Sequence, residues 1–446
     1  MTKAALLGKG DHYITDVALE QMGFKDGLLY FDGATWLCYV PETGLFEEMA
    51  DAVYLFVDNA LHGAEVVGEE EPFNASHRMC TAVEAKARKR CFLAASEDLK
   101  APGIAFANGF LDASSGTLEP HSPKHMATTR VDIPYNPEAT CPAWDSNMRE
   151  VFAGAPDAAG TIRMLEEYFG LCLLGRATLL NHALFLLGES AANGKSTLIE
   201  VVTSLFPVGA VKEISPHKLS GNQAEYYMMS LKGVLLNVVP DMSRKDLYDL
   251  GDYKAIVGGD RITGRNPHGK PESFRPIAGH VNVMNALPNV GDTSGGFWRR
   301  AIAVNFPNSF RDSRRDVQRS KKLMLEREGI LARLVERGLC ALSRGALVIP
   351  EECSQLWKAW RDESNPVKVF LEDIAGTLEL AFDGSIKRNL LYASYKGWCV
   401  ENGRGALNSS NFGKALAAEG IRTKKDSAGT RWYQMQAEGD PDPWSN

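Results

Sequence analysis

The chain has 446 residues, which is more than one ordinary hydrophobic core holds, so we expect about three structural units. Its hydrophobic fraction of 44% and charged fraction of 24% are those of a globular protein, and its net charge of −7 excludes a uniformly basic nucleic-acid-binding chain, so any DNA-binding surface has to be local. Eight scattered cysteines without a Cys-x-x-Cys pair support neither a disulfide framework nor a zinc site, and without a long apolar run we expect a protein that is neither secreted nor membrane-spanning.

The first hundred residues predict an α+β region whose role the sequence does not show. Residues 28–47 contain short apolar segments separated by an Asp-Gly and a Pro-Glu-Thr-Gly turn, which is typical of strands in a small sheet. Helical periodicity follows at 51–61 and at 76–95. The second of these segments carries four basic residues, Lys86, Arg88, Lys89 and Arg90. Such a run usually forms a solvated helix face, and we favour this interpretation over a nucleic-acid-binding surface.

Residues 101–178 predict strands and turns that lead into an apolar helix. Strand and turn patterns occupy 104–111 and 116–135, and Cys-Pro-Ala-Trp at 141–144 marks a boundary. Residues 161–174 are apolar around most of a helix. We therefore expect this helix to be buried or to pack on a partner, and to form a collar between subunits.

The stretch 185–198, Phe-Leu-Leu-Gly-Glu-Ser-Ala-Ala-Asn-Gly-Lys-Ser-Thr-Leu, predicts a strand, a phosphate-binding loop and a helix in that order. In such a loop the lysine amine reaches the β- and γ-phosphates of ATP and the following hydroxyl binds Mg²⁺. The candidate nucleotide-binding residues are Gly188, Asn193, Gly194, Lys195, Ser196 and Thr197. The spacing departs from the usual pattern, because five residues separate Gly188 from Gly194 and Glu189 stands where the first Gly is expected.

Three further apolar segments, at 234–239, 280–285 and 301–306, predict an α/β fold with a parallel sheet buried on both faces. Asp241 follows the first segment and can hold Mg²⁺ together with Ser196. Asn285 ends the second segment and can orient a water molecule against a γ-phosphate. Because ligands bind at the carboxyl edge of such sheets, we expect both side chains near Lys195.

A turn that combines Gly, Pro and Asn with basic residues lies at 261–270. Arg265, His268 and Lys270 are its candidate DNA contacts, since basic residues on a protruding tip attract phosphates. A solvated loop is the alternative.

The C-terminal part of the chain differs in charge from the rest. Residues 385–434 hold nine Lys or Arg against three acids, a net charge of +6. Three helical segments and a hairpin predict a winged-helix domain that binds DNA. Its candidate contacts are Lys414, Arg422, Lys424, Lys425 and Arg431. A basic protein-docking module is the alternative.

Several of these segments resemble the superfamily 3 helicases of the phage and plasmid primase type, which are related to the poxvirus primase-helicase. They are Asn-Gly-Lys-Ser-Thr at 193–197, residues 258–276, Asn-Ala-Leu-Pro at 285–288, Gly-Phe-Trp-Arg-Arg at 296–300 and, more weakly, Ala-Asn-Gly-Phe-Leu-Asp at 107–112 and residues 367–433. The resemblance implies a P-loop NTPase of the AAA+-like type, and a ring, expected to be a hexamer, that translocates on DNA.

The resemblance also implies roles for individual residues. Asp241 resembles the second motif and Asn285 the third, the sensor, while Arg299 or Arg300 resembles the arginine finger given to a neighbour's ATP. The turn at 261–270 is similar to the hairpin that grips DNA in the central pore. The second motif of the family usually has paired acids, whereas Pro240 precedes Asp241 here.

The leading hypothesis is an ATP-dependent DNA helicase or translocase of phage, prophage or plasmid replication in the cytoplasm of a bacterial host. We expect ATP and Mg²⁺ as cofactors, single-stranded DNA in the pore, duplex or origin DNA on the C-terminal module, and a separate primase or polymerase, since the family's polymerising domain is not evident. A nucleotide-controlled DNA-binding initiator or loader without catalysis is the alternative, and a metabolic kinase is a distant third. The expected division is 1–100 (α+β region), 101–178 (collar region), 179–345 (ATPase), 346–365 (connector), 366–436 (winged helix) and 437–446 (tail).

Overall fold

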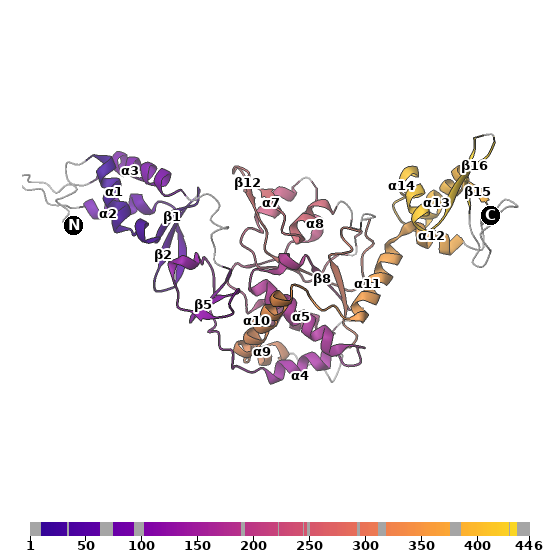
Figure 1. The fold of residues 1–446 in the computed structure, drawn as a ribbon, viewed down its shortest axis with the longest axis horizontal. Coiled ribbons are helices and arrows are strands. Elements are labelled where there is room, and N and C mark those ends of the chain that lie inside the picture. The colour runs from indigo at the N-terminus through magenta and orange to yellow at the C-terminus, as the bar shows by residue number, and fades with distance from the viewer. Residues whose placement is uncertain are drawn as a thin grey trace, which may run out of the picture.

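The computed structural model describes residues 10–33, 35–62, 75–92, 102–188, 192–221, 223–243, 245–247, 250–291, 295–310, 318–374, 385–427 and 429–434. Figure 1 shows three parts in a row, with the N-terminal helices and strands at one end and the C-terminal module at the other. Between them lies a body built around strand β8. Among the described residues, none of the helices combines the length and the apolar character that crossing a bilayer requires.

The N-terminal unit packs three helices on a three-stranded antiparallel sheet of order β1-β2-β3. Its elements are α1 (Asp11–Gln21), β1 (Leu29–Phe31), β2 (Trp36–Val40), β3 (Leu45–Met49), α2 (Ala52–Leu61) and α3 (His77–Arg90). Helix α3 begins where the Ser76 hydroxyl accepts a hydrogen bond from the Met79 N–H at 3.2 Å, which satisfies one of the free donors of its first turn. The strands and helices predicted from the sequence are present here.

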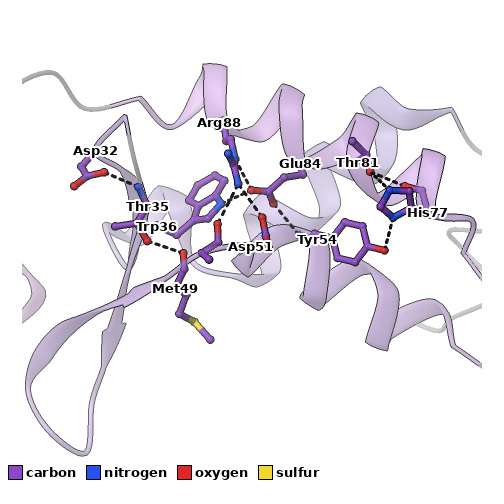
Figure 2. Close-up of polar contacts among 11 residues, drawn as sticks. Asp32, Thr35, Trp36, Met49, Asp51, Tyr54, His77, Thr81, Glu84 and Arg88 are labelled. Atoms are coloured by element: carbon purple, nitrogen blue, oxygen red, sulfur yellow. Dashed lines mark hydrogen bonds and ion pairs between the residues drawn. The ribbon is translucent and has the colours of Figure 1, made fainter. Parts of the chain in front are cut away.

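A buried carboxylate, Glu84 of α3, connects the parts of this unit (Figure 2). Its Oε1 accepts hydrogen bonds from Trp36 Nε1 and from Arg88 Nε, each at 2.6 Å, and its Oε2 accepts one from the backbone N–H of Tyr54 at 2.8 Å. The carboxylate therefore bonds to β2, to the start of α2 and to its own helix. A buried charge needs this many partners to be tolerated.

Most basic residues of α3 form ion pairs with acids of the same N-terminal unit. Three of them form ion pairs with acids, namely Lys86 with Asp11 (3.2 Å), Arg88 with Asp51 (3.0 Å) and Arg90 with Asp16. These ion pairs are partly exposed, so this face of the helix is solvated as expected, and acids of the same unit offset its charge. The acids lie far away in the sequence, and only the packing of α3 against α1 and the start of α2 brings them close.

A four-stranded sheet of order β6-β5-β4-β7 follows. Its strands are β4 (Gly103–Phe106), β5 (Gly109–Asp112), β6 (Leu118–Glu119) and β7 (Arg130–Val131). The Asn108 side chain bonds to both backbone groups of Tyr135, at 2.9 and 3.0 Å, and Asp112 accepts a hydrogen bond from the Ser114 N–H at 2.6 Å. The segment 107–112, which resembles the helicase family, therefore makes turns and contacts that hold this sheet in place.

The body of the protein contains a five-stranded parallel sheet of order β14-β8-β13-β10-β9. Its strands are β8 (Ala183–Leu187), β9 (Val211–Lys212), β10 (Leu236–Val239), β13 (Gly279–Met284) and β14 (Ala301–Asn305). Every residue of β8, β10 and β13 is buried, which confirms the predicted α/β fold with a sheet covered on both faces. Strand β9 was not predicted, because two residues show no pattern.

Helices cover both faces of this sheet. One face carries α4 (Pro142–Val151), α5 (Ala158–Leu173), α6 (Lys195–Thr203), α9 (Arg319–Met324) and α10 (Arg327–Arg344), and the other carries α7 (Ala224–Met229), α8 (Gly251–Val257) and part of α11 (Glu351–Ser364). Helices α5 and α10 meet at Gly170 and Gly338, where a Cβ on Gly170 would overlap the backbone of α10.

Helix α5 corrects two expectations. All its residues from Met164 to Leu173 are buried within the chain, so it has no exposed side along this length for a collar between subunits. It also shares one hydrophobic core with β8, β13 and α10. The boundary expected between residues 178 and 179 therefore does not separate two hydrophobic cores. Within the expected connector 346–365, α11 is a helix that packs on β14.

The C-terminal module has its own core of Phe370, Tyr395 and Phe412, among other side chains. Its elements are α12 (Pro366–Ile374), β15 (Ser385–Lys387), α13 (Arg388–Glu401), α14 (Ser409–Ala418), β16 (Arg422–Lys425) and β17 (Arg431–Gln434), and its sheet has the order β15-β17-β16. The three helices and the hairpin are as predicted, and β15 is an additional strand. The tail 437–446 lies outside the described residues.

Candidate functional site

Strand β8 runs into Gly188, whose missing side chain makes room for two others. A Cβ on Gly188 would overlap Asn193 Nδ2 and Lys195 Nζ. Gly194 has a φ of +88°, which favours glycine, and a Cβ there would lie 2.8 Å from Val151 Cγ2. The two glycines let the chain fold back so that α6 starts beside the end of β8. The turn at Glu189 lies outside the described residues.

Lys195 is held in this turn. Its side chain is buried, with the residue only 5% exposed, and its Nζ donates a hydrogen bond to the Gly188 carbonyl at 2.9 Å. Burial lowers the pKa of Lys195 to about 8, against the opposing effect of the Asp241 carboxylate. The amine is therefore desolvated and gains from any further negative charge placed beside it.

Asp241 and Asn285 reach the same edge of the sheet as Lys195. Both are exposed, at the ends of β10 and β13. The Met242 N–H donates to the Val283 carbonyl at 2.8 Å, which aligns the end of β10 with the end of β13. Parallel strands place their carboxyl ends together, so the prediction that these three side chains share one edge agrees with the structure.

The first turn of α6 lies at the same edge of the sheet as Lys195. Ser196 is exposed and Thr197 is partly exposed, while Asn193 is buried beside Gly188. The helix has nine residues, and its N-terminus carries partial positive charge. The edge thus combines free helical N–H groups, a desolvated amine, a hydroxyl and a carboxylate.

Arg299 and Arg300 lie at the opposite edge of the sheet. They directly precede β14, and the Arg300 carbonyl accepts a hydrogen bond from the N–H of Ala183, the first residue of β8, at 2.8 Å. The length of β8, roughly 13 Å at 3.3 Å per residue, separates them from Lys195. Arg299 is exposed, whereas Arg300 is half-buried and donates from Nη1 to the Gly296 carbonyl at 2.8 Å.

Residues 261–270 form part of the predicted hairpin, with strands β11 (Ile262–Gly264) and β12 (Glu272–Phe274). His268 has a φ of +61° and is exposed, as is Lys270. Arg265 does not extend from the tip. Its Nη2 pairs with Glu225 Oε1 of α7 at 2.6 Å, and its guanidinium lies over the ring of Tyr226. This arginine anchors the hairpin, which the sequence did not show.

The basic candidates of the C-terminal module do not share one face. Lys414 is exposed on α14. Side chains alternate along β16, so Arg422 and Lys424 lie on one side of the hairpin and Lys425 on the other. Lys425 is paired in register with Arg431. The positive charge surrounds the hairpin instead of forming a single patch.

Comparison with known proteins bears on most of the chain. Residues 25–153 match the protein family described as D5 N terminal like. Domains of this type occur in phage and plasmid primase-helicase proteins. The match spans the N-terminal unit from β1, the four-stranded sheet and α4, so it crosses the boundary expected at residue 100. Residues 186–300, from the end of β8 to Arg300, match a family of unknown function, DUF5906.

The fold is also similar to that of solved structures. The A form apo structure of the NrS-1 C terminal region (305-718) superposes with a TM-score of 0.50 at 11% identity, covering 96% of this chain and 100% of that chain. A further apo structure of the same region gives a TM-score of 0.50 at 12% identity with the same coverage. At these identities the likeness concerns the fold alone.

Proposed function

We propose that this protein is an ATP-dependent DNA helicase or translocase of phage, prophage or plasmid replication. The observation that carries the proposal is the placement of Lys195, Asp241 and Asn285 at the carboxyl edge of a parallel sheet whose interior strand β8 leads into the Gly188 turn. The D5 N-terminal match supports the link to phage and plasmid replication.

The residues present fit ATP and Mg²⁺. Phosphates need N–H donors and a cation, and α6 offers its N-terminus together with the amine of Lys195. Asn193 and Gly194 shape the turn, and Thr197 continues the first helical turn. Ser196 and Asp241 supply the oxygen atoms that Mg²⁺ prefers, and the bound metal would neutralise charge on the phosphates.

ATP turnover measured with and without single-stranded DNA tests this proposal. Turnover that rises on addition of single-stranded DNA supports it. An ATP turnover rate that DNA does not change, together with transfer of phosphate to a small molecule, would identify a kinase instead.

A second candidate is a nucleotide-controlled DNA-binding initiator or loader without catalysis. It is favoured by Pro240, which occupies the place where a second acid usually stands before Asp241. In this case the protein binds ATP and DNA, and assembly depends on nucleotide, but no phosphate is released in the same assay.

Nucleotide affinity is expected to depend on pH through Lys195. Its pKa is lowered to about 8 in the free protein, and a bound phosphate would raise that pKa, so binding takes up a proton above pH 8. The affinity for nucleotide should be constant below about pH 8 and should fall about tenfold for each pH unit above it. Titrating a fluorescent ATP analogue between pH 7 and 9.5 measures this. A dissociation constant that does not change over this range contradicts the assignment.

DNA contact is expected at the hairpin and at the C-terminal module. Lys270→Ala should flatten the slope of log affinity against log salt by about one unit, because one phosphate contact is lost. Lys89→Ala removes an exposed lysine of the N-terminal unit and should leave the slope unchanged. Deleting residues 366–446 should weaken DNA binding and preserve basal ATP turnover, since the truncated protein keeps α11 and the bonds of its Trp357 and Trp360 to the body. Loss of basal turnover in the truncated protein would show that the module belongs to the ring.

A further inference from the structure

Two tryptophans of α11 bond to the loops that carry the candidate catalytic residues. Trp357 Nε1 donates a hydrogen bond to the Trp298 carbonyl at 2.6 Å, and Trp360 Nε1 donates one to the Pro288 carbonyl at 2.7 Å. Trp298 directly precedes Arg299, and Pro288 lies three residues after Asn285 in the loop that follows β13. One helix thus holds the backbone at both places.

The aromatic rings add to these bonds. Trp360 packs against Phe185 of β8, Phe297 and Trp298, with ring centroids 5.0, 5.5 and 5.2 Å away. Trp357 packs against Trp298 at 6.2 Å. Tryptophans three residues apart lie on the same face of a helix, so both indoles face the sheet. Each ring is fixed by packing and each N–H is aimed at one carbonyl.

The far end of α11 is also held. The Arg404 guanidinium donates to the Glu363 carbonyl at 3.1 Å, Lys368 pairs with Asp362 at 2.7 Å, and Asn365 donates to Glu419 at 2.8 Å. These partners belong to the C-terminal module. At the beginning of α11, Glu352 accepts hydrogen bonds from the Asp157 N–H at 3.2 Å and from the Thr161 hydroxyl, so both ends of this rod of about 21 Å are bonded. The positions of its indoles are therefore set before any ligand binds.

We infer that Trp357 and Trp360 are positioning residues for the segments that carry Arg299 and Asn285. This inference rests on the proposed function for its catalytic meaning, because Arg299 acts as a finger only if ATP is hydrolysed. Neither indole N–H bonds to Arg299 or Asn285 themselves; Trp357 bonds to the segment before β14 and Trp360 to the segment after β13. Their effect passes through the Trp298 and Pro288 carbonyls, which fix where the exposed Arg299 side chain starts and how the chain leaves Asn285.

Hydrogen exchange provides a readout that needs no ATP. The N–H groups of Arg299, Arg300 and Ala301 bond to carbonyls within 295–297, at 3.2, 2.9 and 3.1 Å. Trp357→Phe keeps a ring and removes the N–H, so exchange of these three amides should become faster while the amides of β8 stay protected. Unchanged exchange at 299–301, or faster exchange throughout the sheet, overturns the inference.

Turnover then separates positioning from simple stability. Trp357→Phe should lower kcat for ATP about tenfold, with the KM for ATP and the affinity for DNA unchanged. Trp36→Phe is the matched control, since it also removes one indole N–H bond, in the N-terminal unit, and it should leave kcat unchanged.

Mixing experiments show whether Trp357→Phe impairs the arginine finger or the phosphate-binding loop. Trp357→Phe subunits should regain turnover when mixed with Lys195→Ala subunits and should not regain it with Arg299→Ala subunits, because two subunits with defective fingers cannot complement each other. Rescue of Arg299→Ala by Trp357→Phe overturns the inference. If the wild-type protein hydrolyses no ATP, the proposed function fails, whereas the exchange result still decides whether the indoles position these segments.

Discussion

Lys195→Ala should lower ATP turnover by about 10²–10³-fold or more, the loss expected when a preorganised group that stabilises developing charge is removed. Lys195 Nζ is the desolvated cation at the end of β8, and among the described residues its hydrogen bond is to the Gly188 carbonyl. The negative charge of an ATP phosphate would stabilise this cation. Steady-state turnover of the purified variant measures the effect.

The variant should still fold. Lys195 is buried, but the hydrogen bond that the variant loses among the described residues is the one to the Gly188 carbonyl, worth about 1 kcal/mol. Its lowered pKa also means that folding already disfavours the charged amine. Thermal unfolding should confirm a native-like transition, and wild-type turnover in that folded variant would refute the nucleotide site.

Asp241→Asn is the companion variant at the same edge. It removes one negative charge and keeps the shape of the side chain. A loss comparable to that of Lys195→Ala would show that one carboxylate is sufficient for the metal. A mild defect would mean that the acid that acts on water lies elsewhere in the assembly.

Arg299→Ala should be inactive alone, with turnover down by about three to five powers of ten, as for arginine fingers in related phosphoryl-transfer sites. Arg299 lies at the amino edge of its own sheet and Lys195 at the carboxyl edge, so this arginine serves a phosphate only across a subunit boundary. Arg299 is exposed, whereas Arg300 is half-buried and bonds to the Gly296 carbonyl, so we favour Arg299 as the finger.

A mixture of Arg299→Ala and Lys195→Ala subunits should recover activity. In a head-to-tail ring assembled from equal amounts, about a quarter of the interfaces combine an intact loop with an intact finger. Turnover as a function of the mixing ratio, with light scattering to give the subunit number, tests both the ring and the finger. Full activity in a monomer, or no recovery at any ratio, would rule out a finger that acts between subunits.

Local patterns in the sequence were sufficient for the elements of the central sheet and of the C-terminal module. Mostly apolar runs predicted β8, β13 and β14, because strands buried on both faces carry apolar side chains at most positions. The buried His280 and Asn282 of β13 are exceptions. The small residues before Lys195 predicted the turn, since only glycine at 188 and 194 leaves room for the neighbouring side chains. Such features depend on neighbours in the chain.

Only the tertiary structure decided which side chains meet. It placed Arg299 at the edge of the sheet opposite Lys195, it paired Arg265 with Glu225, and it buried α5 inside the chain. These outcomes depend on strand order and helix packing. The partners are separated by tens of residues, so no local period records them, and the energy that selects them comes from burial of the whole core.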